Sequence, residues 1–158
     1  MGAGKTTVGK MLAPKINFGF IDMDSEIELI SDLSISEIFK IHGERYFRDL
    51  ETGVLKDISQ KSDQVVSTGG GIVIKEENWE IMKSSGRTIY LKASIETLFN
   101  RVKHKTTRPL LDVEDPFETA KELLESREPL YKKSDLIIDR ERLEPDEVAE
   151  AIVKELGI

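Results

Sequence analysis

The chain alternates short apolar segments with longer segments in which apolar residues recur every three or four positions. The short segments have the length and composition of β-strands and comprise residues 18–22, 64–67, 87–91 and 136–139. The longer segments between them have the spacing of amphipathic helices. Strands that are separated by helices need crossover connections, which favours a parallel sheet covered on both faces. The pattern therefore predicts a three-layer α/β/α fold around a central parallel sheet.

Two further segments stand out in the C-terminal half of the chain. Residues 104–116 are polar and include Arg108 directly before Pro109. Their apolar residues have neither the spacing of a helix nor that of a strand. Loops of this length in compact domains are usually functional or disordered, and we expect a lid here. The last helix should begin at Glu144-Pro145 and end at Gly157, because proline and acidic residues favour a first turn and glycine favours a stop.

The 158 residues carry no internal repeat or linker, and we expect a single domain over residues 1–158. The apolar runs are too short to cross a membrane, and the net charge of −7 argues against nucleic-acid binding. The chain has no cysteine and no basic segment leading into an apolar stretch at its start, so we expect a cytoplasmic protein. We expect it to be a monomer that binds small molecules.

Residues Gly2-Ala3-Gly4-Lys5-Thr6-Thr7 form the second half of the phosphate-binding pattern G-x-x-x-x-G-K-[ST]. Glycines let backbone N–H groups curl around phosphates, lysine supplies positive charge, and the threonine hydroxyl suits Mg²⁺. A glycine-rich turn that merely caps a helix is the alternative. Because the motif opens directly into an amphipathic helix, we favour phosphate binding.

The phosphate-binding pattern is incomplete at its start. Its first glycine would lie two positions before Met1, and no strand leads into the loop. Either the chain is truncated, or translation has been assigned to start at an internal methionine. We expect the chain to be one strand short, and a version longer by roughly eight to ten residues to be more stable and more active.

Two carboxylates, Asp22 and Asp24, lie at the end of the first predicted strand. Side chains two positions apart on an extended segment point the same way, so both can face one cleft. One could help to hold hydrated Mg²⁺ while the other orients or deprotonates an alcohol. Alternatively, Asp24 could simply cap the next helix.

Arg48 and Glu51 lie one helical turn apart. This spacing is typical of a surface ion pair, and it would also let Glu51 hold the guanidinium of Arg48 ready for a carboxylate ligand. Phe39 and Phe47 are either walls of such a pocket or plain core residues. The run Gly69-Gly70-Gly71 follows a predicted strand, and it indicates either a tight turn or a close approach of the backbone to a ligand.

Three arginines are candidates for anion or nucleotide contacts. Arg108 in the predicted lid could close over ATP, or it could be solvated. Arg127 could stabilise the C-terminal carbonyl groups of a helix. Arg101 could stack on an adenine or be exposed.

Six motifs follow one another along the chain: G-A-G-K-T-T, D-M-D-S-E-I-E, G-E-R-Y-F-R-D-L-E, S-T-G-G-G, R-P-L-L and R-E-P-L-Y. In this order they closely resemble the motifs of the shikimate kinase family, whose fold is of the P-loop nucleoside-monophosphate-kinase type. The resemblance runs from Gly2 to the last helix. It implies ATP-dependent phosphorylation of shikimate to shikimate 3-phosphate with Mg²⁺. It also implies that a helical segment over approximately residues 24–60 binds shikimate, and that residues 104–116 form the lid.

The resemblance also implies individual roles. Gly2, Ala3, Gly4, Lys5, Thr6 and Thr7 would hold the ATP phosphates, with Thr6 and Asp22 serving the metal. Asp24, Arg48, Arg127 and the Gly69–Gly71 backbone would bind shikimate. Arg108 would be the lid arginine and Arg101 the adenine-stacking residue. The implied catalytic residues are Lys5, Asp24 and Arg108.

Two other functions are compatible with the same residues. A kinase for another small polyol acid, such as gluconate, would share the phosphate loop and the lid. A non-catalytic form that binds a nucleotide or shikimate would keep the binding residues without turnover.

Overall fold

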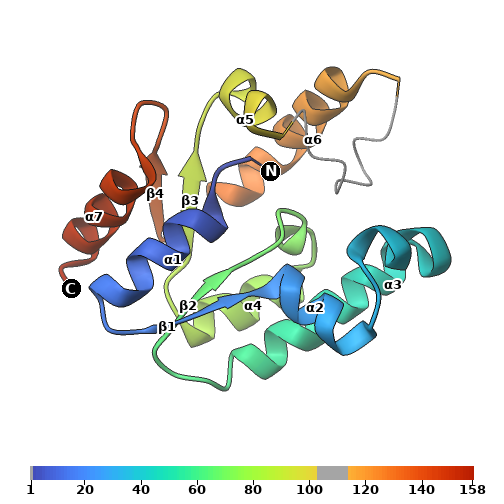
Figure 1. Cartoon of the computed structure of the whole chain (residues 1–158), viewed down its shortest axis with the longest axis horizontal. Helices are drawn as coiled ribbons and strands as arrows, with labels where there is room; N and C mark the ends of the chain where they lie inside the picture. Colours follow the sequence, from blue (N-terminus) through green and yellow to red (C-terminus); the bar gives the residue numbers. More distant parts are fainter. Residues whose placement is uncertain (1, 103–113) are drawn as a thin grey trace.

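The computed structural model describes residues 2–102 and 114–158 and contains helices packed against short parallel strands (Figure 1). In chain order the elements are α1 (Lys5–Lys15), β1 (Gly19–Asp22), α2 (Met23–Ser31), α3 (Ile35–Ile58), β2 (Gln64–Ser67), the short 3₁₀ helix η1 (Ile72–Ile74), α4 (Glu76–Ser85), β3 (Ile89–Lys92), α5 (Ile95–Val102), α6 (Pro116–Tyr131), β4 (Leu136–Asp139) and α7 (Pro145–Leu156). All four predicted strands are present. The second and fourth have the predicted bounds.

The third strand begins two residues later than predicted. The N–H and hydroxyl groups of Thr88 both donate to the carboxylate of Asp135, at 2.8 and 2.7 Å. The N–H of Thr88 is thereby used outside the sheet, and parallel pairing starts with Ile89 opposite Leu136.

The strands form two separate parallel pairs in the part of the chain that the structure describes. β1 pairs with β2, in the register Asp22 opposite Ser67, and β3 pairs with β4. The prediction of parallel pairing is confirmed, and within the described residues no strand hydrogen bonds join β2 to β3, as a missing strand would leave them. A cavity of about 300 Å³ lies there and is lined by residues of both strands, among them Val65, Val66, Ile89 and Leu91.

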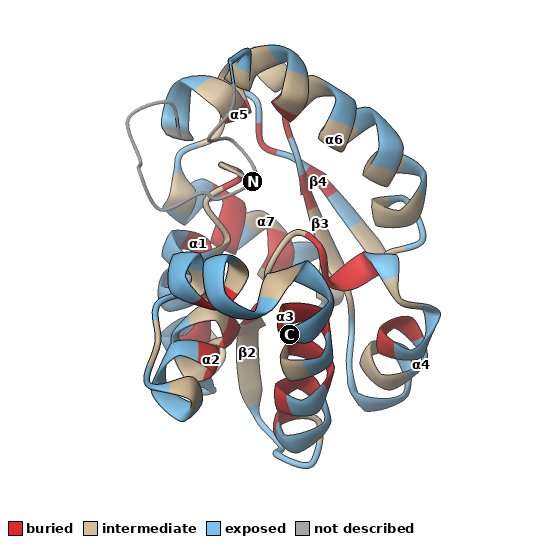
Figure 2. Ribbon diagram, turned by 90° about the vertical axis from the view of Figure 1, so that its right-hand side faces the viewer, coloured by how far each residue is buried: buried red, intermediate tan, exposed pale blue. Residues whose placement is uncertain are grey.

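Two apolar cores surround the strands. One core joins α1, β3, α5, β4 and α7 through residues such as Val8, Leu98 and Ile152. The other joins α2, α3, η1 and α4 and includes Ile38 and Trp79. Figure 2 shows the buried side of α3 turned towards the strands and its exposed side turned outwards. Val65 of β2 packs against the first core and the next residue, Val66, packs against the second, so helices cover both faces of this strand pair, as the sequence predicts.

The predicted helical segment at residues 24–60 consists of two helices. Asp32 ends α2 in a left-handed conformation, and Ser34 and Glu37 form a capping box at the start of α3. Gly43 interrupts α3 with a φ of 81° and a ψ of 172°, values that glycine adopts without strain. The second part of α3 carries Arg48 and Glu51.

The C-terminal helix follows the prediction closely. Glu144 and Glu147 form a capping box around Pro145, and Gly157 ends the helix with a φ of 67°. Val148 and Ile152 are buried on the face that packs inwards.

Residues 104–113 of the predicted lid, including Arg108, lie outside the described residues. At its end the prediction is wrong, because Pro116 is the first residue of α6 rather than part of a loop. Asp115 accepts a hydrogen bond from the N–H of Glu118 at 3.0 Å and so caps this helix. None of the helices in the described ranges is both long and apolar enough to cross a membrane.

Candidate active site

The glycine-rich loop leads directly into helix α1. Gly4 is the residue before the helix, with a φ of 79°, and its carbonyl accepts from the N–H of Val8 at 2.9 Å. Lys5 is the first helical residue, and the first turn contains no acidic side chain. The N–H groups of a first helical turn lack partners within the helix and attract anions. The loop therefore has the local structure that phosphate binding requires.

Thr6 lies beside two oxygen-bearing side chains from the ends of neighbouring strands. Its hydroxyl donates to Asp22 Oδ2 at 2.7 Å, and its Oγ1 is 3.3 Å from Oγ of Ser67. Mg²⁺ prefers oxygen ligands and usually takes one or two from the protein, with the rest from water and phosphate. A hydroxyl next to a carboxylate fits that requirement. Ser67 was missed from the sequence, although its position at the end of β2 could have indicated it.

Asp22, rather than Asp24, caps helix α2. Its Oδ1 accepts from the N–H groups of Asp24 and Ser25, at 3.1 and 3.4 Å. The alternative that Asp24 serves as the cap is therefore wrong. The side chain of Asp24 instead lines the adjacent cavity.

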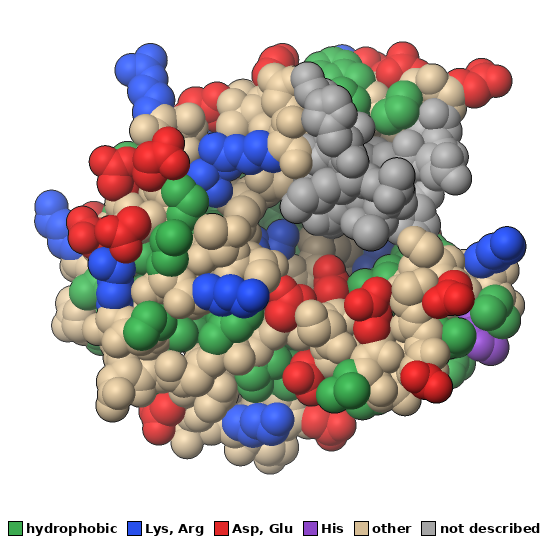
Figure 3. Space-filling view, viewed as in Figure 1, with side chains coloured by type: hydrophobic (Ala, Val, Ile, Leu, Met, Phe, Trp, Pro, Cys, Tyr) green, Lys and Arg blue, Asp and Glu red, His purple; other side chains and the backbone are tan. Residues whose placement is uncertain are grey.

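This cavity has a volume of about 360 Å³, which is within the range of small-molecule sites. Its lining includes all the predicted shikimate-binding residues, which are Asp24, Arg48, Gly69, Gly70, Gly71 and Arg127. Phe39 and Phe47 also line it, with ring centroids 4.9 Å apart, so both act as walls. In the space-filling view the molecule is hollowed near its centre, and acidic side chains border the hollow (Figure 3).

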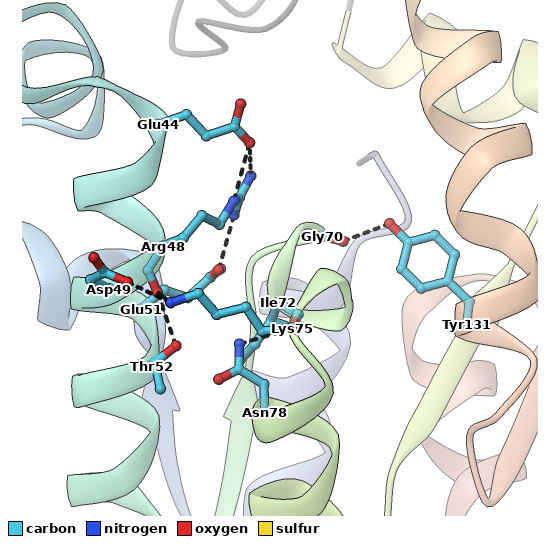
Figure 4. A network of polar contacts seen from close by, with 10 residues as sticks. All are labelled: Glu44, Arg48, Asp49, Glu51, Thr52, Gly70, Ile72, Lys75, Asn78 and Tyr131. Carbon is cyan, nitrogen blue, oxygen red and sulfur yellow. Dashed lines mark hydrogen bonds and ion pairs between the residues drawn. The ribbon is translucent and has the colours of Figure 1, made fainter.

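Arg48 is held by two glutamates of its own helix (Figure 4). Its Nη1 donates to Glu51 Oε2 at 2.9 Å, while Nε and Nη2 donate to Glu44 Oε1 at 3.2 and 2.9 Å. Arg48 is only 8% exposed and Glu51 is 0% exposed, so the alternative of a surface ion pair is wrong. Burial raises the pKa of Glu51, and the charge of Arg48 opposes that rise.

The glycine run packs closely against this ion pair. A Cβ atom on Gly71 would collide with the guanidinium of Arg48, and one on Gly69 would lie 2.7 Å from Glu51 Oε1 and 3.2 Å from Asp24 Oδ1. A close approach was expected, but the groups approached are protein side chains. Because these glycines have no side chains, the loop can pack directly against α3, and together they form one wall of the cavity.

Helix α6 contributes Arg127 and, one turn later, Tyr131. The hydroxyl of Tyr131 donates to the carbonyl of Gly70 at 2.7 Å (Figure 4). The ring of Tyr131 stacks on that of Tyr90. Burial raises the pKa of Tyr131, while Arg127 acts to lower it. Tyr131 thus ties the helix that carries Arg127 to the glycine loop. The motif R-E-P-L-Y contained this tyrosine, but nothing in it indicated the partner.

Lys75 anchors the second part of α3 from outside the cavity. Its ammonium group donates to the carbonyl of Arg48 at 3.2 Å and to Asp49 Oδ1 at 2.6 Å. In the same region the amide of Asn78 donates to the carbonyl of Ile72 at 2.9 Å. The sequence did not indicate these contacts. Lys75 and Asn78 lie at the start of α4, where such residues are usually exposed on the surface.

Arg140, which sequence reasoning also missed, lies behind the phosphate-binding loop. Its Nη1 donates to the carbonyl of Ala3 at 2.5 Å, and its Nη2 donates to that of Leu143 at 3.3 Å. Arg101, by contrast, is exposed in the last turn of α5 and is absent from the lining of the 360 Å³ cavity.

Comparison with known proteins agrees with this geometry. The family model described as shikimate kinase matches residues 1–157. A shikimate kinase of Thermodesulfovibrio yellowstonii is 50% identical over 155 residues, covering 98% of this chain and 90% of that protein. One of Caldanaerobacter subterraneus is 42% identical over 154 residues, with the same coverage.

Solved structures show the same likeness. The structure titled shikimate kinase from Acinetobacter baumannii in complex with shikimate has a TM-score of 0.97 and 36% identity, covering 99% of this chain and 88% of that one. Shikimate kinase from Aquifex aeolicus has a TM-score of 0.87 and 39% identity, covering 99% and 92%. Identity of 50% over nearly the full length, together with the family match, is sufficient to assign the family. The chain belongs to the shikimate kinase family.

Proposed function

We propose that this chain transfers the γ-phosphoryl group of ATP to a hydroxyl of shikimate and so forms shikimate 3-phosphate. The observation that carries this proposal is that Asp24, Arg48, Arg127 and the glycine loop all line the same cavity. Shikimate is a small carboxylate with several hydroxyl groups. Such a ligand requires guanidinium groups at one end and a hydrogen-bond acceptor at the other.

The nucleotide side of the reaction falls to the residues from Gly2 to Thr7. We propose that their backbone N–H groups hold the ATP phosphates and that Lys5 places its charge near the β and γ oxygens. Thr6 and Asp22 would hold Mg²⁺, which members of this family use together with ATP. When bound, the ion neutralises charge that develops on the phosphate oxygens. Arg101 and Arg108 are proposed for the adenine and the lid, respectively.

The acceptor side depends on orientation. Arg48 and Arg127 would take the shikimate carboxylate, since a guanidinium fork matches a carboxylate in shape and charge. Glu44 and Glu51 hold the Arg48 fork in place from its own helix. Asp24 would orient the attacking hydroxyl and accept its proton late, because phosphoryl transfer through a loose transition state depends mainly on positioning and charge stabilisation.

A phosphotransfer assay tests this function directly. ADP release is measured with shikimate and with gluconate as acceptors, and the product is identified by phosphorus NMR. Activity with gluconate alone would overturn the proposal. Shikimate binding without turnover would overturn it in favour of the non-catalytic form.

Lys5→Ala serves as the mechanistic variant of that assay. We expect it to lose phosphoryl transfer while shikimate still binds, because Lys5 lies in the phosphate loop and is not among the residues lining the 360 Å³ cavity. Lys10→Ala, on the exposed side of the same helix, is the matched control and should keep parent activity.

We also propose that the protein works as a cytoplasmic monomer with a single kinase domain and needs neither nucleic acid nor membrane. All the residues proposed for the site come from one chain, and the absence of cysteine is compatible with a reducing compartment. Light scattering after gel filtration tests the oligomeric state, and a mass near 17.9 kDa is expected.

A further inference from the structure

Arg140 is a buried cation at the edge of the sheet where the phosphate-binding loop begins. It directly follows β4, and its backbone N–H donates to the carbonyl of Lys92 at 2.9 Å, which extends the β3–β4 pairing by one step. The residue is only 2% exposed. Its Nε has no hydrogen-bond partner among the described residues.

The guanidinium of Arg140 fits against two residues of the phosphate loop. Nη1 donates to the carbonyl of Ala3, and a Cβ atom on Gly4 would collide with that same nitrogen. Glycine at this position therefore does two things. It permits the left-handed φ of 79°, and it leaves room for the arginine.

Holding the Ala3 carbonyl has a consequence for the next N–H group. A trans peptide unit is planar, and its C=O and N–H bonds point in opposite directions. With the Ala3 carbonyl directed at Arg140, the N–H of Gly4 is directed away from it. The same contact occupies a carbonyl oxygen whose partial negative charge would otherwise repel phosphate.

Charge supports the same interpretation. Burial of a cation without a closely paired acid is costly, and burial lowers the pKa of Arg140, with a further contribution from the charge of Arg101. Glu144 and Glu141 oppose this shift only through longer-range attraction. An anion bound in the adjacent loop would offset the cost.

We propose that Arg140 is a positioning residue for nucleotide binding, which fixes the Ala3–Gly4 peptide unit so that the Gly4 N–H faces the phosphates and adds positive charge behind the loop. This inference rests on the proposed function only in taking the loop as the nucleotide site. It adds a residue from the opposite end of the chain to that site.

Arg140→Met and Arg140→Lys test the proposal, with Arg87→Met as an exposed control. Affinities for ADP and for shikimate are measured by calorimetry, alongside Tm without ligand. Loss of a hydrogen bond to a charged group should weaken ADP binding by roughly ten- to a hundredfold in Arg140→Met. Shikimate affinity should be unchanged, and Arg140→Lys should recover part of the ADP affinity because it keeps the charge.

Stability distinguishes positioning from a merely structural role. Replacing a buried unpaired cation with a methionine of similar length should leave Tm at or above the parent value, while ADP affinity falls. A joint fall of Tm and of both ligand affinities would overturn the proposal, as would unchanged ADP affinity. If the parent binds ADP but does not phosphorylate shikimate, the proposed function fails while the ADP measurements still decide the role of Arg140.

Discussion

Removal of Glu51 is the most informative single change in the acceptor site. In Glu51→Ala the guanidinium of Arg48 loses a buried partner at 2.9 Å but keeps Glu44, whose side chain is 47% exposed. Removing one partner of a buried ion pair typically lowers the free energy of unfolding by about 3–5 kcal/mol. Because Glu44 still pairs with Arg48, we expect a loss at the lower end of this range. About 3 kcal/mol corresponds to a fall in Tm of roughly 6–12 °C for a domain of this size.

The same change should affect one substrate only. Without Glu51 the Arg48 fork is held from one side, so we expect the shikimate KM to rise about tenfold, the equivalent of one weak hydrogen bond. The ATP KM should remain at the parent value. Thermal melts and steady-state kinetics with each substrate varied in turn measure both effects.

Asp49→Ala provides the control for Glu51→Ala. Asp49 lies on the same helix and pairs with Lys75, but its side chain is 62% exposed, so its loss should leave Tm and both KM values near those of the parent. If Glu51→Ala melts within 2 °C of the parent, taken as roughly the effect of 1 kcal/mol, and keeps the shikimate KM, the reasoning about the buried pair is refuted.

The pH dependence of Glu51→Gln gives an independent check. Because burial raises the folded-state pKa of Glu51, the part of its contribution to stability that is linked to protonation is complete below the ordinary value of 4.5 and is lost as pH rises through the folded value, while the ion pair with Arg48 remains. Glutamine does not titrate. The Tm of Glu51→Gln should therefore rise relative to the parent as pH increases from 4.5, and a constant difference would contradict the raised pKa.

Three further predictions concern the loop, a helix cap and the divided sheet. Gly71→Ala places a methyl group against the guanidinium of Arg48, so the shikimate KM should rise while the ATP KM does not. Gly53→Ala, with open space around its Cβ, is the control and should only stabilise the helix, by about 1 kcal/mol. The carboxylate of Glu141 accepts hydrogen bonds from Ser94 and Thr97 at the start of α5, and these lower its pKa to about 2. The contribution of Glu141 to stability is thus present above pH 4.5 and lost as pH falls through 2, so the Tm deficit of Glu141→Gln at pH 7 should shrink in acid; a deficit independent of pH would contradict the lowered pKa. Finally, joining roughly eight to ten residues with an apolar strand pattern ahead of Met1 should fill the cavity between β2 and β3 and raise Tm and kcat, whereas equal values for the two forms would show that the cavity does not accept a strand.

The sequence predicted the elements better than their assembly. Residues 64–67 and 136–139 were predicted to the residue, because a short apolar run between polar turns is a local property. The chain was expected to be one strand short, and the cavity between β2 and β3 agrees with that expectation, but the local patterns did not indicate which strands pair. Which strands pair is decided by contacts between residues far apart in the chain, which periodicity does not encode.

The candidate site shows the same limit at the level of side chains. The spacing of Arg48 and Glu51 is the same for an exposed pair and for a buried one, so only the packing of the glycine loop decides between them. Tyr131 and Gly70 are 61 positions apart. Arg140 belongs to a polar turn that is typical of a solvated surface, and its burial follows from the position of the phosphate loop.

The divided sheet has a mechanical consequence for the acceptor site. Arg48 belongs to the half built on β1 and β2, whereas Arg127 lies on α6, which stacks Tyr131 on Tyr90 of β3. No ladder of strand hydrogen bonds within the described ranges spans the two halves, which are joined by helix packing, including that of α1 against β1, β2 and α7, and by the bond from Tyr131 to Gly70. That bond ties the helix that carries Arg127 to the glycine loop that packs on Arg48, and so helps to set the span between the two arginines and the size of carboxylate that they can bind together.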